Sequence, residues 1–153
     1  MARDYTTDDL RELVPSQHVD HVVELQLAAA VLNHTATRTY GDEKMARIIA
    51  ALNELDNLQL LAADKNQEKG KAVGRLIRRW KLKTYGLPGK SKADVKRKVK
   101  KANAQKGDKK ILDVVRKRWK RLCRNLDFAK SFRDGMTQLL KTSSKIKLDE
   151  VSR

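Results

Sequence analysis

The sequence predicts an α+β protein that is mostly helical and contains one short β-hairpin. Two short runs, at 17–24 and 57–62, have the alternating or β-branched composition of strands. Between and after them, apolar residues recur at the spacing of one helix face. The length of 153 residues suits one domain. Because two strands are too few to form a sheet-based core, we expect a helix to cover the hairpin.

The elements before the second strand are predicted from caps and spacing. A short N-terminal helix is expected within residues 1–14, ended by Val14-Pro15. The first strand follows, and residues 24–56 form an insertion of two helices, one at 25–33 and one beginning at Asp42. The apolar stripe of the second helix is Met45, Ile48, Ile49, Leu52 and Leu55.

The second strand is expected to lead into a long helix from about Asp64 to Tyr85, ended by the Gly-Leu-Pro-Gly stretch at 86–89. Residues 15–86 would then form the core domain, and residues 87–142 a basic helical extension. Within the extension, 90–110 is either a frayed helix or a loop, and one long helix is predicted over about 108–141. Residues 143–153 have the composition of a tail.

The charge is large and unevenly distributed. The net charge is +16, yet residues 1–64 hold 5 basic and 11 acidic residues, whereas residues 65–125 hold 24 basic and 4 acidic residues. A surface this basic indicates a polyanionic partner. Nucleic acid is favoured, because dense phosphates release counterions to Lys and Arg. A membrane surface is disfavoured, because the basic segments lack an apolar face rich in aromatic residues.

Other classes of protein are excluded by composition. The single cysteine, Cys123, excludes a disulfide scaffold and a cysteine-based zinc cluster. No apolar run is long enough to cross a membrane. The first 13 residues lack the apolar region of a secretory signal. We therefore expect an intracellular protein, in the cytoplasm or nucleus.

Three short segments contain the candidate functional residues: VDHVV at 19–23, DNLQLL at 56–61 and ADKNQEK at 63–69. Their order and spacing resemble the HNH family of nucleases, which have the ββα-metal fold. The resemblance is closest to the variant in which the last metal ligand is Asn, as in the HNH domain of the CRISPR RNA-guided nuclease. It covers residues 15–80. The chain departs from the family pattern at Glu24, where a helical insertion replaces the usual turn, and the role of Glu24 is left open.

The resemblance implies a metal-dependent endonuclease that hydrolyses phosphodiester bonds. Asp20 and Asn66 would hold one divalent metal ion, His21 would be the general base, and Asn57 would brace the loop that carries the base. The residue types suit this chemistry. Carboxylate and amide oxygens are ligands for Mg²⁺, which keeps several waters; Mn²⁺, Ni²⁺ and Zn²⁺ are alternatives. An imidazole titrates near neutral pH and can accept a proton from water.

The basic side chains that follow the second strand are candidate phosphate contacts. They are Lys65, Lys69, Lys71, Arg75, Arg78 and Arg79. The preferred substrate would be duplex DNA, bound largely through its backbone. A small basic nuclease of this kind suits a toxin or effector, or a nuclease module of a larger protein. A toxic nuclease would need an inhibitor or immunity protein, or would need to be exported.

A second interpretation remains open. A non-catalytic, basic, helical protein that binds RNA or the ribosome would explain the charge, although it gives no reason for the combination of Asp20, His21 and Asn66. Taken alone, Asp20 and His21 are more typical of an ordinary surface pair, and His18 and His34 are expected to lie outside the site.

Overall fold

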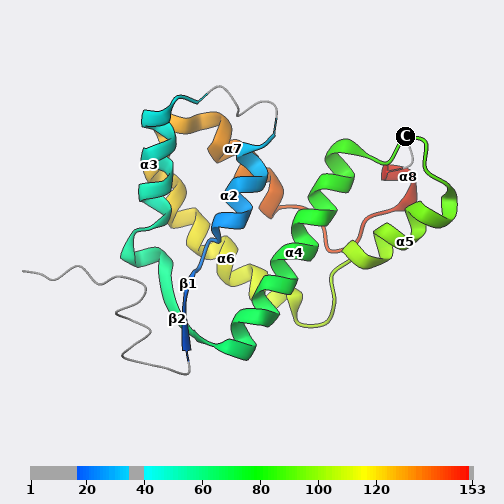
Figure 1. Cartoon of the computed structure of the whole chain (residues 1–153), viewed down its shortest axis with the longest axis horizontal. Coiled ribbons are helices and arrows are strands. Elements are labelled where there is room, and N and C mark those ends of the chain that lie inside the picture. The colour runs from blue at the N-terminus through cyan, green and yellow to red at the C-terminus, as the bar shows by residue number, and fades with distance from the viewer. Residues whose placement is uncertain (1–16, 35–39, 152–153) are drawn as a thin grey trace, which may run out of the picture.

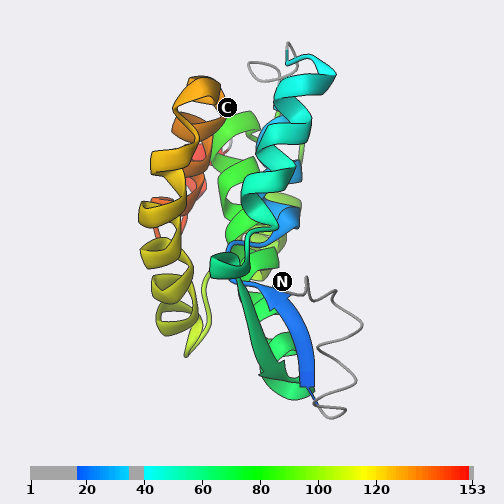
Figure 2. The same cartoon turned by 90° about the vertical axis from the view of Figure 1, so that its left-hand side faces the viewer.

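The computed structural model describes residues 17–34 and 40–151, so the N-terminal helix predicted within residues 1–14 lies outside the described residues. The structure confirms a mostly helical α+β fold with one β-hairpin (Figure 1). Strand β1 (Gln17–His21) pairs antiparallel with β2 (Leu58–Ala62), and Asp20 lies opposite Gln59. The hairpin projects from one end of the helical body (Figure 2).

The insertion between the strands forms two helices, as predicted. Helix α2 spans Leu25–Leu32, helix α3 spans Asp42–Leu52, and a 3₁₀ turn, η2, spans Leu55–Asn57 before β2. Ile48 and Leu52 are buried, whereas Ile49 and Leu55 are 46% and 65% exposed. The prediction that Leu55 continues the apolar stripe of this helix was wrong, because α3 ends at Leu52.

Helix α4 (Ala63–Tyr85) begins directly after β2 and runs through the whole molecule (Figure 1). Its buried apolar side chains pack against α6 and α7 in the larger core. Gly86 ends the helix with a φ of 67°, a conformation that glycine adopts without strain. The long helix expected from about Asp64 to Tyr85 is therefore confirmed.

The lysine-rich stretch after Gly86, for which a frayed helix or a loop was predicted, forms helix α5 (Lys92–Ala102). The Ser91 hydroxyl caps it by accepting a hydrogen bond from the Asp94 N–H at 3.2 Å. Val95, Val99 and Ala102 are buried at helical spacing. Three small apolar residues in a row of lysines are thus enough to hold one face of this helix against its neighbours.

The prediction of one continuous helix over about 108–141 was wrong. Helix α6 (Asp108–Leu122) is followed by the 3₁₀ turns η3 (Cys123–Asn125) and η4 (Asp127–Ala129) and then by helix α7 (Lys130–Leu140). A straight helix of this length would extend for about 50 Å. The reversal instead lets Phe132 pack edge-on against Trp119, with ring centroids 6.1 Å apart, and brings α7 against α2.

The residues predicted to form a tail are packed against the fold. Residues 143–151 include the short helix α8 (Leu148–Val151), and Ile146 and Val151 are buried. They join the smaller core, together with Leu82, Val95, Val99 and Ala102. The Leu87 N–H also donates to the Val151 carbonyl at 2.8 Å. The segment therefore covers the end of α4 and one face of α5.

Helix α4 connects the two cores. The larger core lies between α2, α3, α4, α6 and α7, and the smaller core lies between the end of α4, α5 and α8 (Figure 1). In the part of the chain that the structure describes, no helix is long and apolar enough to cross a membrane.

Candidate active site

The hairpin directs Asp20 and His21 to different neighbours, because successive side chains of a strand point to opposite faces. Asp20 contacts Lys69 of α4. His21 instead reaches the end of α3, where its Nε2 lies 2.7 Å from the Asn53 side-chain oxygen. When Nε2 carries the ring proton, it donates to Asn53 and leaves the lone pair on Nδ1. A hydrogen bond to the Asn53 oxygen therefore requires the tautomer with its proton on Nε2, and it orients the ring.

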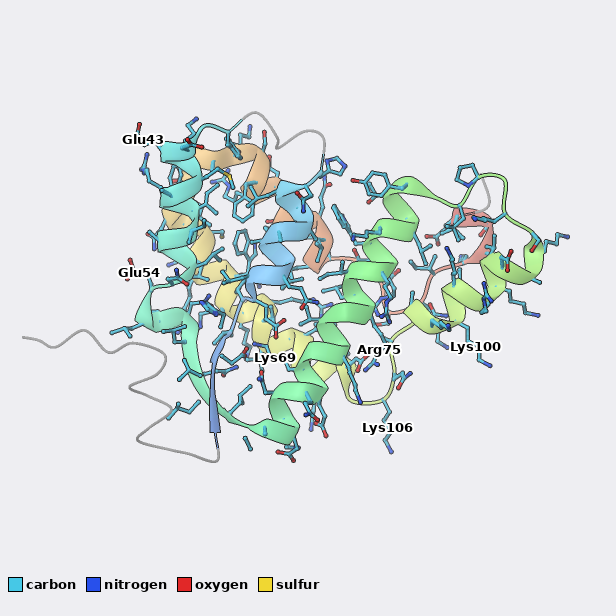
Figure 3. All side chains as sticks on the ribbon, viewed as in Figure 1. Glu43, Glu54, Lys69, Arg75, Lys100 and Lys106 are labelled. Atoms are coloured by element: carbon cyan, nitrogen blue, oxygen red, sulfur yellow. The ribbon has the colours of Figure 1, made fainter. Side chains whose placement is uncertain are left out.

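Lys69 lies on the side of α4 that faces the hairpin (Figure 3). Its Nζ contacts the Asp20 carboxylate, donates to the backbone carbonyl of His21, and lies 3.7 Å from Glu24 Oε1. Lys69 is 4% exposed and Asp20 is 8% exposed. The Gln59 amide donates to the same Asp20 oxygen at 3.2 Å. A buried cation thus holds two carboxylates and the end of β1 together.

Glu24 belongs to this cluster. It is the N-cap residue of α2, and its Oε1 lies 3.7 Å from Lys69 Nζ. Burial raises the pKa of Glu24 above its usual value, the nearby Asp20 charge raises it further, and the attraction of Lys69 opposes both. The sequence left the role of Glu24 open. In the structure its carboxylate faces the same cation, Lys69, as Asp20 does.

Asn57 is fully buried and uses its whole side-chain amide in hydrogen bonds. Its Oδ1 accepts from the Val23 N–H at 2.8 Å, and its Nδ2 donates to the carbonyls of Val23 and Leu52 at 3.0 and 2.8 Å. The Val22 N–H also donates to the Asn57 backbone carbonyl at 2.6 Å. Asn57 therefore ties the segment directly after His21 to the end of α3.

Asn66 lies in the first turns of α4, three residues before Lys69 and half-buried. Residues at this spacing share one helix face, so Asn66 lies on the side of α4 that carries Lys69. The oxygen atoms of Asp20, Glu24 and the His21 carbonyl already surround one positive charge. Such a set of hard donors suits a divalent cation of the Mg²⁺ type. Within residues 17–34 and 40–151, the structure contains no group of three or more His, Cys, Asp or Glu side chains arranged to hold a metal ion.

The six predicted phosphate contacts differ in accessibility. Lys65, Lys71 and Arg78 are exposed. Arg75 is partly buried and donates from Nε and Nη2 to the two Asp108 oxygens, each at 2.7 Å.

Two of these predictions need correction. Arg79 is fully buried and donates from Nε to the Ser143 carbonyl and from Nη1 to the Ala102 carbonyl, both at 2.9 Å. It fastens α5 and the C-terminal segment to α4 and is not available to a phosphate. Lys69 is likewise occupied by Asp20, so its charge is directed into the site and not to solvent. Sequence reasoning placed both residues on the surface because basic side chains are rarely buried.

Two residues near the site were not identified from the sequence. Gln59 lies opposite Asp20 in the hairpin and could have been found from strand register once the pairing was known. Asn53 had no such signal. It is the C-cap of α3, and only the packing of that helix against the hairpin brings it to His21.

Comparisons with protein-family models, curated proteins and solved structures gave no match to this chain.

Proposed function

We propose that this protein is a metal-dependent endonuclease of the HNH type, which hydrolyses phosphodiester bonds in duplex DNA. The observation that carries the proposal is the pairing of Asp20 and His21 at the end of β1. Asp20 contacts the buried Lys69 of α4, and His21 is oriented by Asn53. The resemblance of the sequence to the ββα-metal fold supports the proposal, since two strands and a following helix carry these residues, with α2 and α3 inserted between the strands.

His21 is the general base in this proposal. Its hydrogen bond to Asn53 holds the ring, and Nδ1 is then the atom that takes a proton from the attacking water. Asn57 acts as a positioning residue. Two of its side-chain hydrogen bonds hold the backbone of Val23, two residues after His21, and the third joins this segment to the Leu52 carbonyl, so the ring is presented from a rigid segment.

Asp20 and Asn66 would hold the divalent ion, with Glu24 close to the same position. The bound ion would neutralise charge on the phosphate and on the leaving oxygen. Lys69 now contacts Asp20, where it compensates the carboxylate charge. If a divalent ion bound here, the Lys69 ammonium would have to move away from the Asp20 carboxylate.

The exposed cations outside this cluster bind substrate. Lys65, Lys71 and Arg78 contact phosphates of the DNA backbone, while Arg75 is held by Asp108. A nuclease that recognises mainly the backbone would be harmful to its own cell. A toxin or effector role, controlled by an inhibitor or immunity protein, is part of this proposal.

A plasmid-nicking assay tests the proposal. The purified protein should cut supercoiled plasmid with Mg²⁺ and stop when EDTA is added. His21→Ala should lower the rate about 10²–10⁴-fold, the range typical of a lost general base, while DNA binding is retained. His34→Ala is the matched control, because His34 lies outside the site, and it should cut as the wild type does. Equal cutting by His21→Ala would overturn the mechanism.

The alternative is a non-catalytic protein that binds RNA or the ribosome through the basic residues of 65–125. The distribution of charge favours it as much as it favours a nuclease, since most of these residues lie outside the candidate site. Failure to cut DNA or RNA with Mg²⁺, Mn²⁺, Zn²⁺ or Ni²⁺, together with tight RNA binding, would support this alternative.

A further inference from the structure

Helix α4 carries two glycines, Gly70 and Gly74, four residues apart in its interior. Glycine is the least favourable residue in a helix interior except for proline. Neither residue has a positive φ. A Cβ built on either one meets no heavy atom within 4 Å in the described part of the chain. Neither backbone conformation nor packing within the described structure therefore explains why these positions lack side chains.

The glycines form the floor of an open groove of about 430 Å³. Lys71, Arg75 and Arg78 of α4 line it, and Gln26 of α2 contributes from the adjoining helix. Because residues four apart share one face, Asn66 of the candidate active site lies one turn before Gly70 on the same side of α4. The candidate metal ligand thus lies one helical turn from a residue that lines the groove.

A second cleft, of about 550 Å³, neighbours the groove. It lies between α4 and α5, and Arg78 lines both. Its other basic residues are Lys81, Arg97, Lys98 and Lys101. In the described structure no Asp or Glu lines either hollow. From Gly70 to Lys81 the helix rises about 17 Å, which corresponds to about five base-pair steps of 3.4 Å each.

We propose that these two hollows, which share Arg78 and extend from Gly70 and Gly74 to the α4–α5 cleft, are the track that binds the phosphate backbone of DNA. The glycines allow a backbone to approach the helix closely, since no side chain stands between them and the ligand. Lys71 and Arg78 supply phosphate contacts on either side. The inference rests on the proposed function, because it identifies the surface that would lead one strand of the substrate to the active site.

The α5 side of the track lies outside residues 15–80, where the sequence resembles the HNH family. Helix α5 packs on α4 through the buried residues Val95, Val99 and Ala102, and Arg79 also ties the end of α5 to α4. The extension therefore builds one wall of the binding surface. It gives the basic residues of 92–101 a function that their lysine-rich composition alone did not assign.

Binding of a 20-base-pair duplex, measured by fluorescence anisotropy in EDTA, tests the inference without relying on cleavage. Gly74→Gln should weaken binding about tenfold, because its side chain fills the groove. Ala46→Gln, which adds a similar side chain to the exposed face of α3, should leave the affinity unchanged. Gly70→Ala combined with Gly74→Ala should raise the melting temperature and still weaken binding. A thermal stability that rises without any loss of affinity would overturn the inference.

The salt dependence of binding gives a second readout. Arg78→Ala should reduce the slope of log K against log salt by about one, the value for one lost phosphate contact. Lys83→Ala removes the same charge from another face of α4 and should change the slope less. Equal slopes for the two variants would count against the track.

The two proposals fail separately. If the wild type binds DNA through the groove but never cuts it, the track is supported and the nuclease proposal is overturned. If the wild type cuts DNA and Gly74→Gln binds and cuts as well as the wild type, the nuclease proposal stands and the track is overturned.

Discussion

Helix α4 buries one basic side chain near each end, and the two have different surroundings. Lys69 contacts the Asp20 carboxylate, lies near Glu24 and donates to the His21 carbonyl. Within the described residues, Arg79 donates to two backbone carbonyls, those of Ala102 and Ser143. Both side chains are almost completely hidden from solvent. Two buried basic residues of one helix therefore have different partners. Lys69 lies among carboxylates, whereas Arg79 joins two backbone segments.

From these different surroundings we infer that a metal ion can replace the Lys69 ammonium but not the Arg79 guanidinium. A divalent ion binds carboxylates strongly and can take the place of an ammonium among them. The carbonyls around Arg79 need hydrogen-bond donors in the fixed arrangement that the guanidinium supplies. Burial lowers the pKa of Arg79, and the charge of Asp108 opposes this change. Lys69 thus marks a candidate site, whereas Arg79 marks a structural junction.

The largest expected effect is that of Lys69→Met. Removing one partner of a buried ion pair costs about 3–5 kcal/mol, because Asp20 is left buried without its compensating charge. The free energy of unfolding, measured with urea in EDTA, should fall by this amount. Millimolar Mg²⁺ should recover part of the loss in Lys69→Met and stabilise the wild type less. A variant that gains nothing from Mg²⁺ would contradict the assignment of this cluster as a cation site.

Arg79→Met should destabilise the protein by about 3 kcal/mol. Two carbonyls lose their donors, the buried one of Ala102 and the partly buried one of Ser143, at about 1–3 kcal/mol each. Ala102 is also the last residue of α5, whose carbonyl has no partner within the helix. Mg²⁺ should not restore this stability. Arg78→Met is the matched control from the adjacent, exposed position, and it should change the free energy of unfolding by no more than about 0.5 kcal/mol. Similar losses in both variants would show that the junction does not depend on Arg79.

Asp108→Asn should cost about 2 kcal/mol at neutral pH, the typical value for hydrogen bonds to a charged group. Burial pushes the pKa of Asp108 upward, but its hydrogen bonds from Arg75 and the Gln105 N–H, with the charges of Arg75 and Arg79, outweigh this and lower it. A lowered pKa contributes stability above the unfolded value of about 3.9, and this stability is lost as the pH falls through the folded value.

The difference in the free energy of unfolding between the wild type and Asp108→Asn should therefore have its full value at pH 7 and disappear below about pH 4. Urea unfolding at several pH values measures it. A gap that stays constant down to pH 2 would mean that the carboxylate charge is not what stabilises the contact with Arg75.

The smallest expected effect is that of Asn53→Ala on catalysis. If Asn53 holds His21, its loss should lower the cleavage rate about tenfold, which corresponds to about 1.4 kcal/mol, and leave DNA affinity unchanged. Asn53→Asp should recover part of the rate, because a carboxylate also accepts from Nε2. An unchanged rate in Asn53→Ala would remove Asn53 from the mechanism and leave Lys69 and its carboxylates as the center of the site.

Local patterns predicted the fold class and the elements that define the candidate site. The strand at Asp20 and His21, the strand beginning after Asn57 and the helix carrying Asn66 were all found from spacing and composition, with boundaries shifted by a few residues. They could be found because strand alternation and helical periodicity depend on neighbouring residues alone. The resemblance to the HNH family implied that Asn57 braces the loop after His21. In the structure its side chain donates to the carbonyls of Val23 and Leu52 and accepts from the Val23 N–H.

Local sequence patterns did not predict how distant segments pack against one another. The segment 108–141 has an apolar stripe that runs past Leu126, so periodicity continued the helix, whereas the structure reverses the chain to bury Phe132 against Trp119. The residues from Ser143 onward are polar enough to suggest a tail, yet Ile146 and Val151 complete the smaller core. A stripe shows that a face will be buried but does not identify the segment that covers it.

By itself, the sequence determined the helical class of the chain, the hairpin, the order of the three motifs and the division into an acidic first part and a basic second part. The tertiary structure alone decided which charges face solvent. It placed Lys69 among carboxylates, Arg79 among backbone carbonyls, and Lys71 and Arg78 beside an open groove. The physical reason is that a side chain's charge follows from its chemistry, whereas its burial and its partners depend on segments that can lie more than 60 residues away, as Ser143 does from Arg79.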